Sequence, residues 1–172
     1  MNTHDRIVKE VTLRAPLTRV WRAIADAGEF GQWFGVRLEG EFAAGKAMRG
    51  MFDKKIDVAL IADYQRSLGL PPSGIRLPDS DLIFCTVERI EPPEYFSFRW
   101  IPYGIDAAVD PESEPTTLVE FRLVEVAEGT RLTITESGFD KVPEHRRERA
   151  FRMNDVGWAV QTENVKKHVE EN

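Results

Sequence analysis

Alternating apolar and polar positions run through most of the chain and predict short β-strands. At 130–136 the alternation places Leu132, Ile134 and Glu136 on one strand face, so a carboxylate follows two core residues. Similar patterns predict further strands at 6–15, 36–42, 46–51, 82–90, 95–101 and 117–126. Short turns such as Glu128-Gly129 join several of these strands, which favours an antiparallel meander.

Apolar residues spaced by three and four positions predict helices at both ends of the chain. A short helix is expected at 17–27, after Pro16, and a second short turn of helix at 29–34. A long helix is expected at 145–170. One side of it carries Phe151, Asn154, Trp158, Thr162, Val165 and Val169. Because a helix that only closes a core rarely carries amides and hydroxyls in its apolar stripe, this pattern indicates a pocket with a few polar groups.

The segment 53–81 has two readings. Asp53 can cap a helix over 54–68 that Gly69 would end, with Ile56, Leu60, Tyr64 and Leu68 in one row. Alternation at 56–60 leaves a continued strand open, although we favour the helix. We expect this segment to dock on the surface as a lid over the ligand site, and a sheet-edge or dimer contact remains the alternative.

These elements together predict an α+β fold in which a curved antiparallel sheet wraps around the long C-terminal helix. The chain of 172 residues fits one domain, 1–172, with an insertion at about 53–81. Hydrophobic residues make up 42% and charged residues 30% of the chain, which is typical of a globular protein. A net charge of −6 without a block of basic residues argues against nucleic acid as a partner.

Several further features exclude other classes of protein. No apolar run approaches the ~20 residues of a membrane span, and the N-terminus lacks the apolar core of a signal peptide. Cys85 is the only cysteine, so no internal disulfide can form, and it is expected to be buried in a cytoplasmic protein. Three histidines fall in no ligand spacing, so we expect neither a metal nor a cofactor.

Two charged stretches are interpreted as solvated surface. Basic residues gather at 145–152 (HRRERAFR), where two glutamates dilute or flank them, and this pattern is typical of an exposed helix face. Acidic residues gather at 106–114, where prolines and the absence of a calcium-loop spacing favour a solvated loop.

At this point several motifs resemble a known family. VTLRAPLTRVWRAIAD followed by FGQWF is similar to the opening of the SRPBCC (START-like) superfamily. VERIEPPEYFSFRW, EPTTLVEFRL, GTRLTITESGF and RMNDVGWAVQTENVKKHV resemble its branch named after the C-terminal domain of the activator of heat-shock-protein-90 ATPase. The likeness covers nearly the whole chain apart from 53–81. It implies a helix-grip fold with an apolar cavity between the sheet and the C-terminal helix.

The candidate site follows from these faces. Glu136 is its central residue: turned inward it could bind a ligand or act as a general base, whereas at the strand end it could cap the Gly138 turn or pair with an arginine. Aromatic and amide side chains are expected around it. The candidate ligand-binding residues are Trp33, Phe34, Phe98, Trp100, Glu136, Asn154, Trp158 and Gln161. Plain packing is the alternative for the aromatic residues Trp33, Phe34, Phe98, Trp100 and Trp158. For Asn154 and Gln161 the alternative is hydrogen bonding to loop backbone.

Three functions remain open at this level. The favoured one is non-catalytic binding of a small hydrophobic molecule, in a protein that could also form a homodimer. A partner of the heat-shock ATPase is disfavoured, since the family's activators carry a further N-terminal domain and this chain starts close to its first strand. The third is an enzyme of cyclase, dehydratase or hydrolase type that uses Glu136 as its base. Under the favoured function, no residue is predicted to be catalytic.

Overall fold

The computed structural model describes residues 6–52, 58–74 and 83–171 of the chain. Its strands are β1 Arg6–Leu13, β2 Val36–Leu38, β3 Ala47–Phe52, β4 Ile83–Glu91, β5 Tyr95–Trp100, β6 Thr117–Val126 and β7 Gly129–Ser137. Its helices are α1 Leu17–Ala25, α2 Ala27–Phe34, α3 Val58–Ser67, the short 3₁₀ helix η1 Phe139–Lys141 and α4 Glu144–Glu171.

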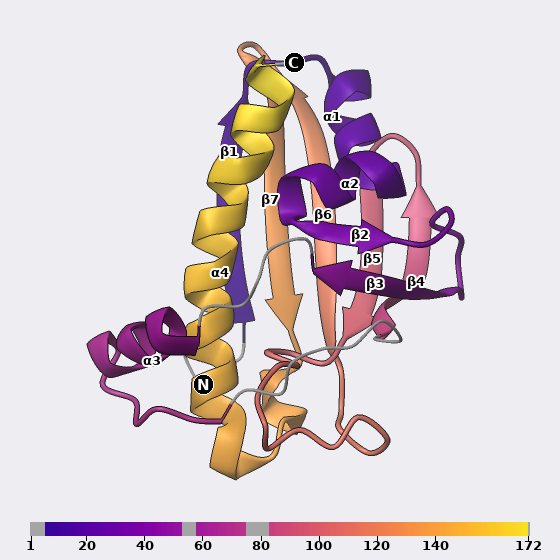
Figure 1. Cartoon of the computed structure of the whole chain (residues 1–172). Helices are drawn as coiled ribbons and strands as arrows, with labels where there is room; N and C mark the ends of the chain where they lie inside the picture. The colour runs from indigo at the N-terminus through magenta and orange to yellow at the C-terminus, as the bar shows by residue number, and fades with distance from the viewer. Residues whose placement is uncertain (1–5, 53–57, 75–82, 172) are drawn as a thin grey trace.

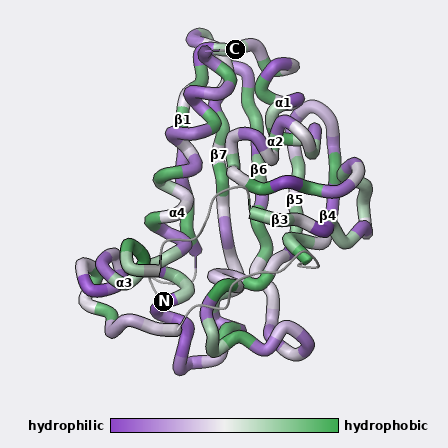
Figure 2. Tube along the Cα trace, viewed as in Figure 1, coloured by the Kyte–Doolittle hydropathy of each residue, from purple (hydrophilic) through white to green (hydrophobic). Residues whose placement is uncertain are grey.

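The seven strands form one curved antiparallel sheet in the order β1-β7-β6-β5-β4-β3-β2. Helix α4 runs along β1 and β7, and α1 and α2 cover the same face of the sheet beyond it (Figure 1). Hydrophilic and hydrophobic residues are mixed along α4 (Figure 2), and one side of the helix closes the core, with buried residues Ala150, Phe151, Trp158, Val165 and Val169. The predicted α+β helix-grip architecture, with two short N-terminal helices, is confirmed.

The junction between α1 and α2 differs from the prediction. The first helix ends at Ala25, because Asp26 is extended and its side chain accepts a hydrogen bond from the Glu29 amide at 2.9 Å. Asp26 therefore caps a full second helix. Gly31 in that helix lies so close to β2 that an added Cβ would be 2.2 Å from the Val36 carbonyl oxygen. Only glycine permits this contact between α2 and the edge strand β2.

The segment 53–81 contains a helix, as predicted, over Val58–Ser67, while 53–57 and 75–82 lie outside the described residues. The expected apolar row is wrong at Leu60 and Tyr64, which are 54% and 44% exposed, whereas Leu68 is half-buried and Ile56 lies outside the described residues. The buried residue is Gln65, which donates to the Tyr103 hydroxyl at 2.9 Å and accepts from the Ser73 amide at 3.0 Å. This polar contact holds the helix. Because both the nitrogen and the oxygen of the Gln65 side-chain amide are hydrogen-bonded, the side chain can be buried.

Aromatic rings fill the space between sheet and helices. Phe30 of α2 lies at their centre and contacts rings from α2, the β2–β3 turn and three strands of the sheet. Its neighbours, at centroid distances of 4.7 to 6.2 Å, are Trp33, Phe34, Phe42, Phe84, Phe98 and Phe121. Most of these pairs are tilted or edge-on, the arrangement that ring quadrupoles favour. Cys85 is buried in this core, as predicted, and burial raises the pKa of its thiol to about 12.

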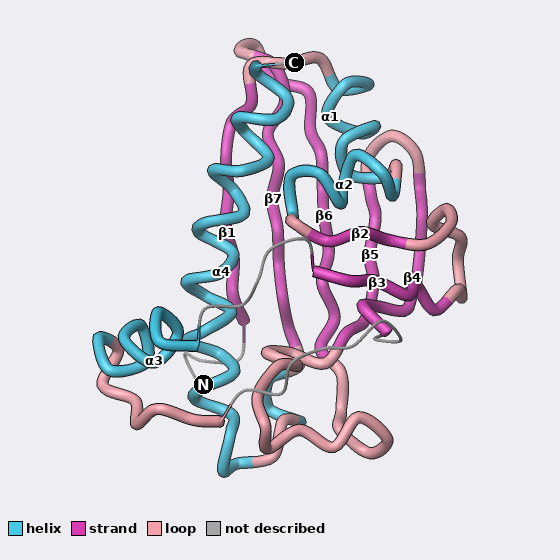
Figure 3. The backbone as a smooth tube through the Cα atoms, viewed as in Figure 1, coloured by secondary structure: helices cyan, strands magenta, loops and turns pink. Residues whose placement is uncertain are grey.

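A buried ion cluster fixes the N-terminal end of α4. Arg146 is only 2% exposed and pairs with Glu114, lies 3.8 Å from Asp106 and donates to the Pro102 carbonyl at 2.7 Å. The loop that carries these partners gathers below the sheet beside this end of the helix (Figure 3). The prediction that both charged stretches are solvated is therefore wrong for Arg146, Asp106 and Glu114. These residues come from the two stretches, and their opposite charges are buried against one another.

A second polar cluster joins α1, α2 and α4 near the opposite end. The Glu29 carboxylate accepts hydrogen bonds from Arg19 at 2.8 Å and Arg22 at 2.6 Å, and it lies 2.9 Å from His168 Nε2. Burial alone would raise the pKa of Glu29, but the hydrogen bonds from His168, Arg22 and Arg19 outweigh it and lower that pKa below its usual value. Helix α4 is thus tied at both ends by charged contacts.

We expect Arg146→Ala to lower the free energy of unfolding by ~3–5 kcal/mol, because it leaves two buried carboxylates without their cation. Arg66→Ala serves as the control, since Arg66 makes an exposed pair with Asp63 at 3.0 Å and should change stability by at most ~1 kcal/mol. Urea unfolding of both variants measures the difference. Equal effects would contradict a structural role for the Arg146 cluster.

Candidate functional site

Glu136 lies on the inner face of the sheet, in the strand that crosses below the middle of α4. It sits in β7 between Ile7 of β1 and Val119 of β6. The alternation that buries Leu132 and Ile134 also turns Glu136 inward, and its exposure is 0%. The sequence-based prediction of an inner carboxylate is confirmed.

Two neighbouring strands supply hydrogen-bond donors to this carboxylate. Trp100 is the last residue of β5, Thr117 is the first residue of β6, and the two are directly paired across the strands. The Trp100 indole N–H donates to Oε2 of Glu136 at 2.8 Å, and the Thr117 hydroxyl is 2.6 Å from the same oxygen. Strand register therefore places both groups beside Glu136.

Helix α4 supplies the remaining donors. Asn154 and Trp158 are one helical turn apart and face the sheet together. The Asn154 side-chain amide donates to Oε1 and Oε2 of Glu136 at 3.0 and 3.1 Å, and the Trp158 indole N–H donates to Oε1 at 2.8 Å. Four uncharged side chains from three elements thus converge on one carboxylate.

The electrostatics of Glu136 are set by burial. Desolvation raises its pKa, and the hydrogen bonds from Thr117, Trp100, Trp158 and Asn154 lower it by less, so the pKa lies above the usual value for a glutamate. None of these four partners carries a charge. The alternative that Glu136 pairs with an arginine is not found among the described residues.

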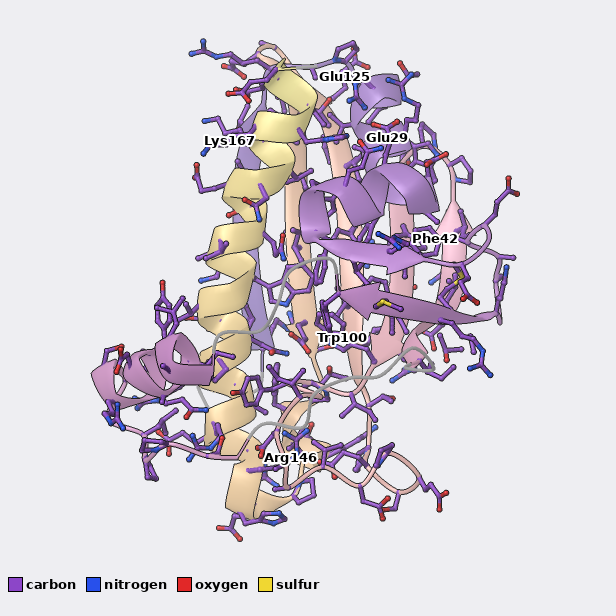
Figure 4. All side chains as sticks on the ribbon, viewed as in Figure 1. Glu29, Phe42, Trp100, Glu125, Arg146 and Lys167 are labelled. Atoms are coloured by element: carbon purple, nitrogen blue, oxygen red, sulfur yellow. The ribbon has the colours of Figure 1, made fainter. Side chains whose placement is uncertain are left out.

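Aromatic rings form the surroundings of this cluster. The Trp100 and Trp158 rings are 5.5 Å apart, and the Phe34 ring lies 6.0 Å from each of them. Phe98 is fully buried and lies 5.4 Å from Trp100. Phe34, Trp100 and Asn154 are only half-buried, so the space beside Glu136 borders on accessible surface. Trp100 lies between α4 and β3 (Figure 4).

Six of the eight candidate residues therefore come together: Phe34, Phe98, Trp100, Glu136, Asn154 and Trp158. The polar atoms of the other two are used elsewhere. Trp33 is buried and its indole N–H donates to the Ala23 carbonyl at 2.9 Å, which holds α2 against α1. Gln161 donates to the Phe34 carbonyl at 3.0 Å and accepts from Asn164 at 3.1 Å, so it fixes the end of α2.

The candidate set omitted Thr117. The alternation that sends Val119 and Phe121 inward has the same phase at Thr117, so this residue could have been found from the strand pattern alone. Its contact with Glu136 depends on the pairing of β6 with β7, which the sequence does not specify. Alternation predicts the face, and register is needed to predict the partner.

Other surfaces offer less chemistry. A broad depression of about 810 Å³ lies between residues 14–18 and the β6–β7 turn at 125–129, and it has no aromatic lining. Glu136 is seven residues along β7 from Gly129, roughly 20 Å away at ~3.3 Å per residue, so this depression is separate from the aromatic cluster. Within the described residues no group of histidine, cysteine and acidic side chains is suited to a metal ion.

Comparison with known proteins places the chain in a family. The family model of the Activator of Hsp90 ATPase homolog 1-like protein matches residues 80–170, just over half of the 172 residues. The chain belongs to this family. The resemblance inferred from the sequence motifs is thereby confirmed, and the matched part of the chain includes all of the residues that bind Glu136.

Solved structures support the same fold. Protein MLL2253 from Mesorhizobium loti has a TM-score of 0.66 and 20% identity, over 97% of this chain and 98% of that chain. The Aha1 dimer from Colwellia psychrerythraea has a TM-score of 0.62 and 15% identity, over 96% of both chains. Protein BH1534 from Bacillus halodurans has a TM-score of 0.60 and 24% identity, also over 96% of both. At these identities the likeness shows the fold alone.

A search of the curated proteins gives no match. Across the described ranges, no helix combines the length and the apolar character that crossing a membrane requires.

We expect Glu136→Gln to destabilise the protein by about 1–3 kcal/mol near pH 4, where the charge difference is small. One indole N–H donates to each carboxylate oxygen, and indoles only donate, so the new amide NH₂ must face a donor in either orientation. Urea unfolding of both proteins measures the penalty. Glu88→Gln, on an exposed pair with Arg99, is the control and should cost at most ~1 kcal/mol.

The same comparison tests the pKa of Glu136. The folded-state pKa of Glu136 is raised, so protonation of this residue stabilises the folded protein. This contribution to the free energy of unfolding is complete below the unfolded pKa of ~4.3 and is lost as pH rises through the folded pKa. The penalty of Glu136→Gln should therefore shrink as pH rises above about 4. A penalty that grows with pH would show that the hydrogen bonds outweigh burial.

Proposed function

We propose that this protein binds a small hydrophobic molecule between the sheet and α4, against Phe34, Trp100 and Trp158. The observation that carries the proposal is the burial of Glu136 within an aromatic cluster without a charged partner. A buried carboxylate destabilises a fold relative to an apolar side chain of similar size. Residues that break the rules of stable packing are concentrated at functional sites, which supports a role here.

The exposure of the surrounding side chains supports access for a ligand. Trp158 is buried, whereas Phe34, Trp100 and Asn154 retain partial exposure. A molecule that reaches the faces of the half-buried Phe34 and Trp100 rings would bury its own apolar surface and that of the rings. Burial of this kind supplies most of the affinity in small-molecule sites, and a few polar groups set the orientation.

The acceptor positions of the Glu136 carboxylate are already occupied by hydrogen bonds, which favours binding over catalysis. An ionised carboxylate offers about four acceptor positions. Five hydrogen-bond contacts from Trp100, Thr117, Asn154 and Trp158 reach its two oxygens. A general base must reach the proton that it removes, and these contacts leave no acceptor position facing a substrate.

Freshly purified protein, analysed by native mass spectrometry, tests the proposal directly. We expect a bound mass that dissociates on mild activation. The same spectrum reports the assembly, and we propose a homodimer by analogy with the Colwellia psychrerythraea relative, which is described as a dimer. Monomers alone would contradict the dimer without affecting the ligand site.

Titration with the neutral fluorophore Nile red locates the site. Phe34→Leu should weaken binding roughly 3–10-fold, because it removes one ring face from the cluster. Phe42→Leu is a matched control: Phe34 and Phe42 are both half-buried and lie 5.3 and 5.6 Å from Phe30, but only Phe34 contacts Trp100 and Trp158. Absence of saturable binding to the wild-type protein would refute the proposal.

A further inference from the structure

The polar atoms of the site are almost all committed to one another. The N–H groups of Trp100 and Trp158 and the hydroxyl of Thr117 are directed at Glu136. Gln161 is engaged at both ends, by the Phe34 carbonyl and by Asn164. The described side chains around the aromatic cluster therefore offer a ligand almost no hydrogen-bond donor.

Asn154 is the exception, and Glu136 determines what it offers. Both contacts of its amide nitrogen are to the carboxylate, at 3.0 and 3.1 Å. Because both carboxylate oxygens accept, the NH₂ group must face Glu136, and this fixes the orientation of the amide. The carbonyl oxygen Oδ1 of the half-buried Asn154 then points away from Glu136 and presents an acceptor.

Two of the basic side chains on the neighbouring turns of α4, Arg146 and Arg152, are engaged elsewhere, whereas Arg149 between them has a buried Nη1 without a hydrogen-bond partner among the described residues. Arg146 pairs with Glu114 and Asp106 at the end of the helix. Arg152 donates to the Leu68 carbonyl and pairs with Glu148 at 2.9 Å. An anionic ligand beside Glu136 would thus meet the Asn154 acceptor and a buried carboxyl group, and the guanidinium groups of Arg146 and Arg152 are already bound to other partners.

We propose that the site selects an uncharged apolar molecule that carries a hydrogen-bond donor, such as a phenol or an alcohol, and discriminates against organic acids. Asn154 Oδ1 accepts the hydroxyl proton, and the faces of Phe34 and Trp100 bind the apolar body. This inference rests on the proposed function and specifies its ligand class. Asn154 is the specificity residue, and Glu136 acts through it by holding the amide in one orientation.

Three naphthalene derivatives of similar shape test the inference by isothermal titration or fluorescence quenching at neutral pH. The phenol 2-naphthol carries the donor, 2-methoxynaphthalene lacks it, and 2-naphthoate is an anion. We expect 2-naphthol to bind about 3–10-fold more tightly than 2-methoxynaphthalene, the range for one hydrogen bond. We expect 2-naphthoate to bind most weakly of the three.

Two variants separate a role in recognition from a role in folding. Asn154→Leu removes the acceptor, so the preference for 2-naphthol over 2-methoxynaphthalene should fall to about onefold while 2-methoxynaphthalene still binds. Phe42→Leu is the control. The Phe42 ring contacts Phe30 and Phe96 and lies outside the Glu136 cluster, so the preference should persist in this variant.

The outcomes distinguish this inference from the function on which it rests. If none of the three compounds binds the wild-type protein, the proposed hydrophobic site itself fails. If they bind but 2-naphthoate equals or exceeds 2-naphthol, the site stands and the inference is overturned. A preference that survives in Asn154→Leu also overturns it, and if that variant does not fold, the ranking of the three compounds on the wild-type protein decides alone.

Discussion

The burial of the Glu136 carboxylate is the constraint on which the middle of this molecule depends. A carboxyl group without solvent contact must receive hydrogen bonds, and here they come from β5, β6 and α4. Each donor group is at its required distance only if the register of the sheet and the rotation of the helix are both correct. One side chain therefore couples the position of α4 to the pairing of three strands.

The choice of donors determines the character of the surroundings. An arginine could have satisfied the same carboxylate and neutralised its charge with a single side chain. Two tryptophans, an asparagine and a threonine provide the hydrogen bonds without a charge, and the indoles add large apolar faces. The result is a polar group enclosed by rings that also contact Phe34 and Phe98. Such an environment suits a ligand that is mostly apolar.

Local patterns predict most of the fold because the sheet and the long helix each repeat with a regular period. The inward direction of Glu136 and the shared face of Asn154 and Trp158 follow from these periods alone. The junction at Asp26 was missed, since a cap depends on a backbone turn and the 17–34 stretch contains apolar residues throughout. Alternation could not choose between neighbours, so the partners of Glu136 depended on strand register.

Contacts between distant charged segments were the least predictable. Arg146 and Glu114 are 32 residues apart, and each belongs to a stretch whose composition is typical of solvated surface. Burial of such a pair requires that a long loop and the start of a helix meet, which no local period encodes. Gln65 is a similar case, because a polar residue replaces the expected apolar row as the buried contact of α3.

Three of the tethers of α4 differ in a way that indicates where function resides. Near the start of the helix Arg146 is compensated by carboxylates, and near its end His168 contacts Glu29 beside two arginines. Arg146 meets carboxylates at one end, and Glu29 meets two arginines of α1 at the other, so opposite charges pair beside both ends of this helix of 28 residues. The middle tether has a buried carboxylate and only uncharged donors. Since the ends already fix the helix, the uncompensated group in the middle is best explained by what it arranges around itself, namely an oriented amide and two indole faces.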